Sequence, residues 1–125
     1  MIEQTLVLVK PDGIARGLIG EIINRFERRG LKIVGLKLTQ ANEDLAKKHY
    51  TEDIAERRGE KVRKLLLNFI ISSPVVAMCV EGVDAVENVR KLVGETEPKS
   101  AIPGTIRGDY AHVSYGHADE KEIAV

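Results

Sequence analysis

Five polar side chains stand where predicted strands and helices end, and each has chemistry that suits a phosphate group. Lys and Arg neutralise the charge of phosphate oxygens, and Thr and Tyr donate hydrogen bonds to them. The standard phosphate loops are missing, because no G-x-x-x-x-G-K-[ST] motif occurs and Gly13, Gly17 and Gly20 lack the spacing of G-x-G-x-x-G. Any phosphate site must therefore be assembled by the fold from single side chains. The candidates are Lys10, Tyr50, Arg90, Thr96 and Arg107.

Each candidate also has an ordinary structural explanation. Lys at a strand end is usually solvated, and Arg90 could serve the carbonyl groups at the end of its helix. Thr96 could be a turn hydroxyl and Tyr50 a core aromatic with an exposed tip. The triplet Arg107-Gly108-Asp109 resembles an adhesion tripeptide, although such triplets arise by chance in Gly-rich loops. Residue type and periodicity do not decide between these interpretations.

Composition limits the classes of protein to consider. A chain of 125 residues with 43% apolar residues suits one compact domain, 1–125. Nineteen Lys and Arg balance nineteen Asp and Glu, so no overall positive field favours nucleic acid. The single cysteine, Cys79, excludes an internal disulfide and suits a reducing compartment. With no targeting segment and no apolar run of membrane-spanning length, we expect a soluble, cytoplasmic protein without a membrane or nucleic-acid partner.

Strand-like and helix-like segments alternate along the chain. Short aliphatic runs predict strands at 5–9, 31–38 and 75–80, with a turn at 10–13. Apolar periodicity and terminal residues predict helices at 18–30, 42–48, 60–71 and 84–94, the last opened by a capping box of Asp84 and Glu87. The order β-α-β-α-α-β-α indicates an α/β (α+β) sandwich of the ferredoxin-like kind, with helices covering an antiparallel sheet.

The C-terminal stretch 95–125 contains prolines and three glycines but no sustained periodicity, and it is predicted to be a long loop. A ferredoxin-like sheet needs a fourth strand, and only Glu122-Ile-Ala-Val125 suggests the beginning of one. We therefore expect the fourth strand to be missing from these 125 residues.

Four blocks of sequence resemble the nucleoside diphosphate kinase family. They are TLVLVKPDGIARGLIG at 5–20, SSPVVAMCVEG at 72–82, VRKLVGETEP at 89–98 and PGTIRGDY at 103–110. They occur in family order and span almost the whole chain. The resemblance implies transfer of the γ-phosphate of a nucleoside triphosphate such as ATP to a nucleoside diphosphate through a phosphohistidine. It also implies Mg²⁺ bound with the nucleotide and a homo-oligomer, either a hexamer or a tetramer.

The resemblance gives the five candidates a shared role. Lys10 matches the lysine of the family's VKPDG motif, which contacts the sugar hydroxyl near the reacting phosphate. Tyr50 matches the tyrosine that approaches the transferred phosphate. Arg90, Thr96 and Arg107 match the residues that hold the distal phosphates. Positioning and charge neutralisation are most of what phosphoryl transfer asks of a protein.

Two features depart from the family pattern. The family's nucleophilic histidine lies in an N-x-x-H-x-S motif on the fourth strand, and this motif does not occur in the 125 residues. His117 is the candidate substitute, but its flanks match weakly, and we expect a solvated loop histidine. The segment between Tyr50 and Phe69 is a few residues longer than in the family and lacks its Pro-Phe-Phe stretch, one Phe of which stacks on the base. Counting back from Pro74 places Val62 at that stacking position, although the insertion leaves room for another residue to fill the role.

Three hypotheses follow. The main one is a nucleoside diphosphate kinase. The second is a catalytically incompetent nucleotide-binding or scaffold form of the same fold, and the third is an adhesion module that uses Arg107-Gly108-Asp109. An N-x-x-H-x-S motif in the coding sequence beyond Val125 would favour the enzyme, whereas a stop codon would favour the second hypothesis.

Overall fold

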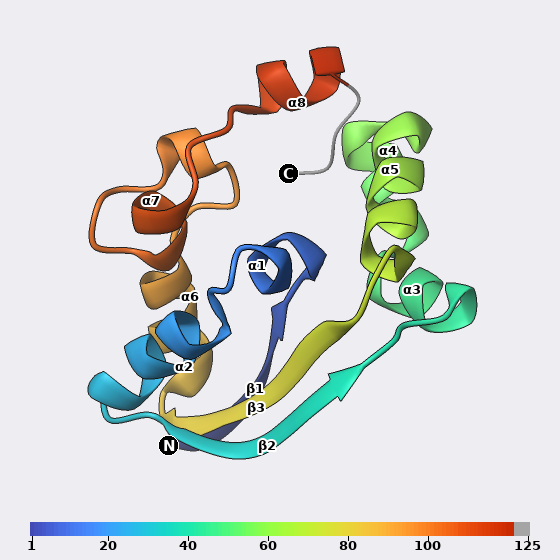
Figure 1. Ribbon diagram of the computed structural model, residues 1–125. Coiled ribbons are helices and arrows are strands. Elements are labelled where there is room, and N and C mark those ends of the chain that lie inside the picture. Colours follow the sequence, from blue (N-terminus) through green and yellow to red (C-terminus); the bar gives the residue numbers. More distant parts are fainter. Residues whose placement is uncertain (122–125) are drawn as a thin grey trace.

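The computed structural model describes residues 1–121, and a three-stranded antiparallel sheet forms its base (Figure 1). The outer strands β1 (Ile2–Val9) and β2 (Lys32–Thr39) both pair with the central strand β3 (Val75–Val83). Helix α2 (Ile19–Arg28) connects β1 to β2 across the inserted β3, which is the split β-α-β arrangement of a ferredoxin-like sheet. The predicted strands and fold class are thus confirmed. Residues 122–125, where the sequence suggests the beginning of a fourth strand, lie outside the described residues.

Helices account for most of the remaining chain. Besides α2 they are α1 (Pro11–Ala15), α3 (Glu43–His49), α4 (Glu52–Arg58), α5 (Glu60–Ile71), α6 (Ala85–Val93), the 3-10 helix η1 (Pro98–Ser100), α7 (Ile106–Tyr110) and α8 (Tyr115–Lys121). The four predicted helices are confirmed, and α5 has its predicted bounds. The turn predicted at 10–13 is wrong, because Pro11 occupies the first helical turn of α1, where its missing N–H needs no partner.

Two helix starts show where the sequence signals hold and fail. The Asn42 side chain accepts a hydrogen bond from the Leu45 N–H at 2.8 Å and caps α3, as its residue type predicts. The capping box predicted for α6 is wrong. Asp84 adopts a left-handed conformation with φ of 50°, and its side chain makes no capping bond. Its carboxylate instead lies 3.9 Å from the ammonium group of Met1, so Asp84 joins the start of α6 to the start of β1.

The loop predicted for 95–125 is also wrong within the described residues, because η1, α7 and α8 form there. Thr105 caps α7 by accepting a hydrogen bond from the Gly108 N–H at 3.0 Å. Helices of three to seven residues show too few apolar repeats for periodicity to reveal them. His117 lies on α8 and not in a loop, although it is exposed as expected.

Two apolar clusters join the helices to the sheet. Phe26 of α2 packs with Met78 and Val80 of β3 in the larger cluster, to which α6 and α7 also contribute. A smaller cluster joins β3 to α3 and α5 around Tyr50 and Ile70. The helices therefore rise as two walls, one of α2, α6 and α7 and the other of α3, α4 and α5 (Figure 1). No helix within residues 1–121 has the length and apolar character that crossing a membrane requires.

Candidate functional site

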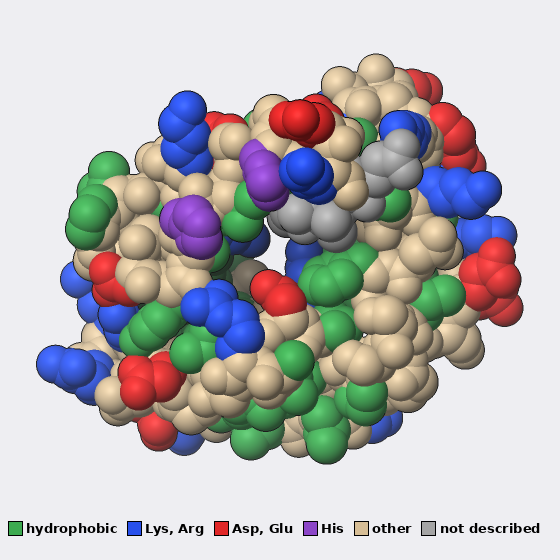
Figure 2. Space-filling view, turned by 45° about the horizontal axis from the view of Figure 1, so that its top comes forward, with side chains coloured by type: hydrophobic (Ala, Val, Ile, Leu, Met, Phe, Trp, Pro, Cys, Tyr) green, Lys and Arg blue, Asp and Glu red, His purple; other side chains and the backbone are tan. Residues whose placement is uncertain are grey.

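A cavity of about 1130 Å³ lies between the two walls, and Figure 2 shows the surface hollowed there. It is lined by β1, by the end of α3, by α4 and α6, and by the chain from the end of α6 to α7. Each predicted phosphate ligand comes from a different position on this lining: the end of β1, the end of α3, α6, the loop after α6, and α7. They are Lys10, Tyr50, Arg90, Thr96 and Arg107.

Two other candidates lie elsewhere. Val62 is half-buried on α5, and His117 is exposed on α8. Neither is among the residues of the described chain that line the cavity. The structure therefore brings together the five phosphate candidates without the predicted base-covering residue or the substitute nucleophile.

The Lys10 and Tyr50 side chains form one corner of the cavity. The Lys10 ammonium lies 5.4 Å from the centroid of the Tyr50 ring, within the range of a cation–π contact. Tyr50 is only 7% exposed, and its hydroxyl has no hydrogen-bond partner among the described residues. An unpartnered buried hydroxyl costs about 1–3 kcal/mol, which a hydrogen bond to a ligand oxygen would recover once the ring moved toward the cavity. The buried Arg63 fixes this corner from behind, because its Nε donates to the Tyr50 carbonyl at 3.3 Å.

The opposite wall carries Arg90, Thr96 and Arg107. Arg90 and Thr96 are exposed, whereas Arg107 is half-buried and its Nη1 donates to the Gly94 carbonyl at 3.2 Å. Burial lowers the pKa of Arg107 from its ordinary value, and nearby Tyr115 and Tyr50 oppose that change. The guanidinium stays cationic near neutral pH. Because it has lost part of its hydration, an anionic partner interacts with it more strongly than with an exposed arginine.

Two glycines allow α7 to pack against the end of α6, which is what brings Arg107 to this wall. Gly94 has φ of 88°, and a Cβ there would lie 2.7 Å from the Thr105 hydroxyl oxygen. A Cβ at Gly108 would lie 1.9 Å from the Ile102 carbonyl oxygen. Both positions therefore exclude larger residues.

Three basic side chains on the lining are not among the predicted site residues: Arg57 of α4, Lys91 of α6, and His49 of α3, which the sequence suggests is only a helix-end residue. Arg57 lies in the segment that departs from the family pattern, so no motif marked it. Burial, and to a smaller extent the charge of Lys10, lowers the pKa of His49, which keeps the imidazole neutral near pH 7. The lining carries five lysine and arginine side chains against the carboxylates of Glu87 and Glu95, in a chain whose formal net charge is zero.

The donor set suits a metal ion that arrives with a ligand. No group of three or more His, Cys, Asp or Glu side chains within residues 1–121 is arranged to hold a metal. Mg²⁺ is often bound by one or two carboxylates together with substrate phosphates. Glu87 and Glu95 are the carboxylates on the lining, so the described residues fit Mg²⁺ carried by a phosphate group.

Comparison with known proteins finds a matching family and relatives of high sequence identity. The sequence model of the family described as nucleoside diphosphate kinase matches residues 3–122. A nucleoside diphosphate kinase of Borreliella burgdorferi is 52% identical over 126 aligned positions, which cover 100% of this chain and 75% of that protein. A nucleoside diphosphate kinase of Pyrococcus abyssi is 57% identical over 109 positions, which cover 87% of this chain and 66% of that protein.

Solved structures give the same result. A transition-state mimic of the Borrelia burgdorferi nucleoside diphosphate kinase with bound vanadate and ADP superposes with a TM-score of 0.95 at 52% identity, covering 99% of this chain and 74% of that one. A halophilic nucleoside diphosphate kinase from Halobacterium salinarum in complex with CDP superposes with a TM-score of 0.82 at 49% identity, covering 94% and 74%. The family match over residues 3–122, together with relatives more than 50% identical, shows that the chain belongs to the nucleoside diphosphate kinase family.

Proposed function

We propose that the cavity between the two walls binds nucleoside di- and triphosphates for γ-phosphate transfer. The observation that carries the proposal is that five residues spread from position 10 to position 107 line one cavity. The resemblance to the family assigns phosphate or sugar contacts to all five. The Borrelia relative with bound ADP and vanadate supports the proposal, since its fold is the same.

The position of each residue on the cavity lining suggests which part of the nucleotide it would bind. Arg90, Thr96 and Arg107 share one wall and would hold the distal phosphates, and the planar guanidinium groups suit bidentate phosphate binding. On the opposite corner, Lys10 would contact the sugar hydroxyl and the reacting phosphate, and the buried Tyr50 hydroxyl would donate to a phosphate oxygen. Mg²⁺ bound with the nucleotide would supply further neutralisation of the phosphate charge.

The nucleophile is the remaining part of the site. His117 is exposed on α8 and lies off the cavity lining, so its position gives no support for a substitute role. β1 is an outer strand, and its residues 5–8 line the cavity. A fourth strand paired with β1 would therefore present side chains to the cavity beside Lys10. We propose that a histidine on such a strand completes the enzyme, and that the 125 residues alone bind nucleotide without forming a phosphohistidine.

Replacement of Arg107 tests nucleotide binding. Arg107→Ala should weaken ADP binding by about 1–3 kcal/mol, because a charged hydrogen-bond partner of the phosphate is lost. Isothermal titration calorimetry measures this change, and the melting temperature without nucleotide should stay nearly constant. Arg28→Ala, which removes an exposed arginine of α2 away from the cavity, is the matched control. Equal ADP affinity in Arg107→Ala and the parent would rule out the proposed site.

Labelling with γ-labelled ATP tests the transfer chemistry. The 125-residue chain should yield no acid-labile, alkali-stable phosphoryl adduct, since the N-x-x-H-x-S motif is not part of it. A longer chain that carries such a motif should be labelled. Labelling of the 125-residue chain that His117→Ala abolishes would place the nucleophile on α8. Absence of labelling in both chains would favour the nucleotide-binding or scaffold hypothesis.

The geometry gives the adhesion hypothesis no support. Gly108 lies inside α7, Arg107 is half-buried against the cavity, and the Asp109 carboxylate is held by Arg25 and by the Gly104 N–H. A recognition tripeptide needs its charged groups displayed together for a partner. These side chains are instead engaged within the fold.

We also propose that the protein assembles as a homo-oligomer, a hexamer or tetramer, as the resemblance implies. Leu36 and Leu38 on the outer strand β2 are 60% and 65% exposed. Large exposed apolar side chains on this strand support assembly through its surface. Light scattering coupled to size-exclusion chromatography measures the assembly, and a monomer at micromolar concentration would contradict this part of the proposal.

A further inference from the structure

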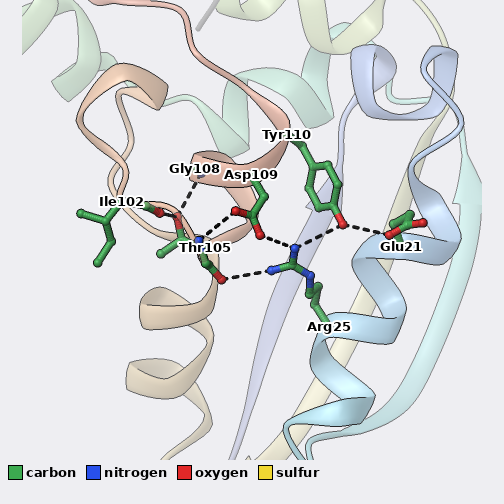
Figure 3. A network of polar contacts seen from close by, with 8 residues as sticks. Glu21, Arg25, Ile102, Thr105, Gly108, Asp109 and Tyr110 are labelled. Atoms are coloured by element: carbon green, nitrogen blue, oxygen red, sulfur yellow. Dashed lines mark hydrogen bonds and ion pairs between the residues drawn. The ribbon is translucent and has the colours of Figure 1, made fainter.

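A network of polar contacts, the α7 network, ties the segment around α7 to helix α2 (Figure 3). Its members are Glu21, Arg25, Gly104, Asp109 and Tyr110. Arg25 of α2 donates from Nη1 to the Gly104 carbonyl at 3.0 Å and forms an ion pair through Nη2 with the Asp109 carboxylate. The other Asp109 oxygen accepts from the Gly104 N–H at 2.8 Å. Both backbone polar groups of Gly104 are therefore held by one pair of charged side chains.

The end of α7 is attached to the same surface. The Tyr110 hydroxyl donates to Glu21 of α2 at 2.8 Å and accepts a hydrogen bond from Arg25 at 3.3 Å. The Arg25 guanidinium lies 5.1 Å from the centroid of the Tyr110 ring, and Arg16 donates to the Tyr110 carbonyl at 2.6 Å. The α7 network thus fixes α7 at both its beginning and its end.

Arg107 lies on the same short helix, on the side that faces the cavity. Asp109 follows Arg107 by two residues, and at about 100° per residue their side chains leave α7 on nearly opposite sides. Arg107 points to Gly94 and the cavity, while Asp109 points to Arg25. A helix of five residues has too few internal hydrogen bonds to be rigid on its own. The direction of Arg107 therefore depends on what anchors α7 from behind.

We propose that Arg25 and Asp109 are positioning residues for nucleotide binding, which hold α7 so that the Arg107 guanidinium meets the distal phosphate. This inference rests on the proposed function, because it takes Arg107 as a phosphate ligand. Neither Arg25 nor Asp109 lines the cavity, so neither touches the nucleotide itself. Their effect passes through α7.

A purely structural role makes a different prediction from a positioning role. If the α7 network only stabilises the fold, its loss lowers the melting temperature but leaves the ratio of ADP to AMP affinity unchanged. If the α7 network positions Arg107, its loss weakens the binding of ADP more than that of AMP, because AMP lacks the β-phosphate that Arg107 would meet. The ratio of the two affinities therefore separates the two roles.

Calorimetry with ADP and AMP on variants of the 125-residue chain provides the test. Asp109→Ala should weaken ADP binding about three- to tenfold, in the range of coupling between residues that share a network, and AMP binding much less. Asp109→Asn should have a smaller effect, because its amide oxygen still accepts from the Gly104 N–H. Glu43→Gln is the matched control for Asp109→Asn, because it also replaces a carboxylate with an amide, in the exposed ion pair of Glu43 and Lys47 on α3, 3.1 Å apart. This control variant should bind both ADP and AMP as the parent does.

A double-variant cycle completes the test. In the Arg107→Ala background, Asp109→Ala should cause no further loss of ADP affinity, because the residue it positions is gone. Additive losses, or an unchanged ratio of ADP to AMP affinity in Asp109→Ala, would overturn the positioning role. If Arg107→Ala itself binds ADP as the parent does, the proposed function fails, and this inference fails with it. Circular dichroism identifies unfolded variants, and Asp109→Asn then decides in place of Asp109→Ala.

Discussion

Replacing Gly108 with alanine probes how closely α7 packs beneath Arg107. The new Cβ would lie 1.9 Å from the Ile102 carbonyl oxygen, 2.5 Å from the Ile102 carbonyl carbon and 2.7 Å from the Thr105 hydroxyl oxygen. Two of these three atoms belong to the backbone, so no rotamer change can relieve the overlap. The turn from Ile102 to Gly108 would have to open by about 1.5 Å to restore ordinary contact.

The sign of the effect depends on two opposing contributions. Alanine in place of glycine within a helix stabilises it by about 0.5–1 kcal/mol. Overpacking costs about 1–3 kcal/mol, and opening the turn weakens two hydrogen bonds worth about 0.5–1.5 kcal/mol each. These bonds run from the Gly108 N–H to Thr105 at 3.0 Å and from the Thr105 hydroxyl to the Ile102 carbonyl at 2.6 Å. We expect a net loss of about 2 kcal/mol, equivalent to roughly 6–12 °C in melting temperature for a domain of this size.

Gly20→Ala is the matched control. Gly20 lies in the first turn of α2, and apart from its chain neighbours and the helix backbone no atom lies within 4 Å of a Cβ placed there, so alanine should raise the unfolding free energy by at most about 0.5–1 kcal/mol. Denaturant unfolding followed by circular dichroism compares both variants with the parent. The Gly108→Ala variant should also lose ADP affinity, since α7 carries Arg107. Equal stability of the two alanine variants would refute the close approach of Ile102 to Gly108.

Two other predictions concern protonation and base recognition. The hydrogen bond from the Gly104 N–H, and to a smaller extent the Arg25 side chain, lowers the pKa of Asp109 below its ordinary value of 3.8. The ionised Asp109 carboxylate therefore stabilises the fold fully above pH 3.8, and this stabilisation is lost as the pH falls through the lower pKa of the folded state. The stability difference between the parent and Asp109→Asn should therefore shrink in acid unfolding curves below about pH 3.8, and a constant difference would contradict this. Tyr50 is the only Phe, Tyr or Trp side chain on the cavity lining within residues 1–121, and Val62 offers no ring. ADP, GDP and CDP should therefore bind with dissociation constants within about a hundredfold of one another in calorimetry, and a stronger preference would require a hydrogen-bonding base reader.

The parts of the fold that the sequence predicts are those with a repeated apolar pattern. Helix α5 has its predicted bounds because Leu66 and Ile70, among others, recur at helical spacing and pack into one cluster. The short helices α1, α7 and α8 depend on a proline, a threonine cap and local contacts, which leave no period to detect. The Asp84 capping signal failed because the chain turns there with a positive φ, which residue spacing does not encode.

In the site, too, residues within matching sequence blocks were predictable, whereas contacts between residues far apart in the chain were not. Lys10, Arg90 and Arg107 could be named beforehand because each stands in a sequence block that matches the family. Arg25 lies outside these blocks, and Asp109 lies inside the block at 103–110 but nothing in the block reveals its role, because their contact joins residues 84 positions apart. Sequence blocks therefore supply candidate residues, whereas tertiary contacts decide which of them hold α7 in place.

Pairing of charges explains how a chain of zero formal net charge acquires a cationic cavity. Arg57 and Lys91 line the cavity but are paired with Asp53 and Glu87, both at 3.2 Å. In contrast, the three predicted cations of the lining, Lys10, Arg90 and Arg107, form no ion pair within residues 1–121. Unpaired cations on a concave wall focus a positive field into the cavity, while paired ones contribute little. The acidic residues therefore neutralise the surface and leave the unpaired positive charge where a nucleotide phosphate would enter.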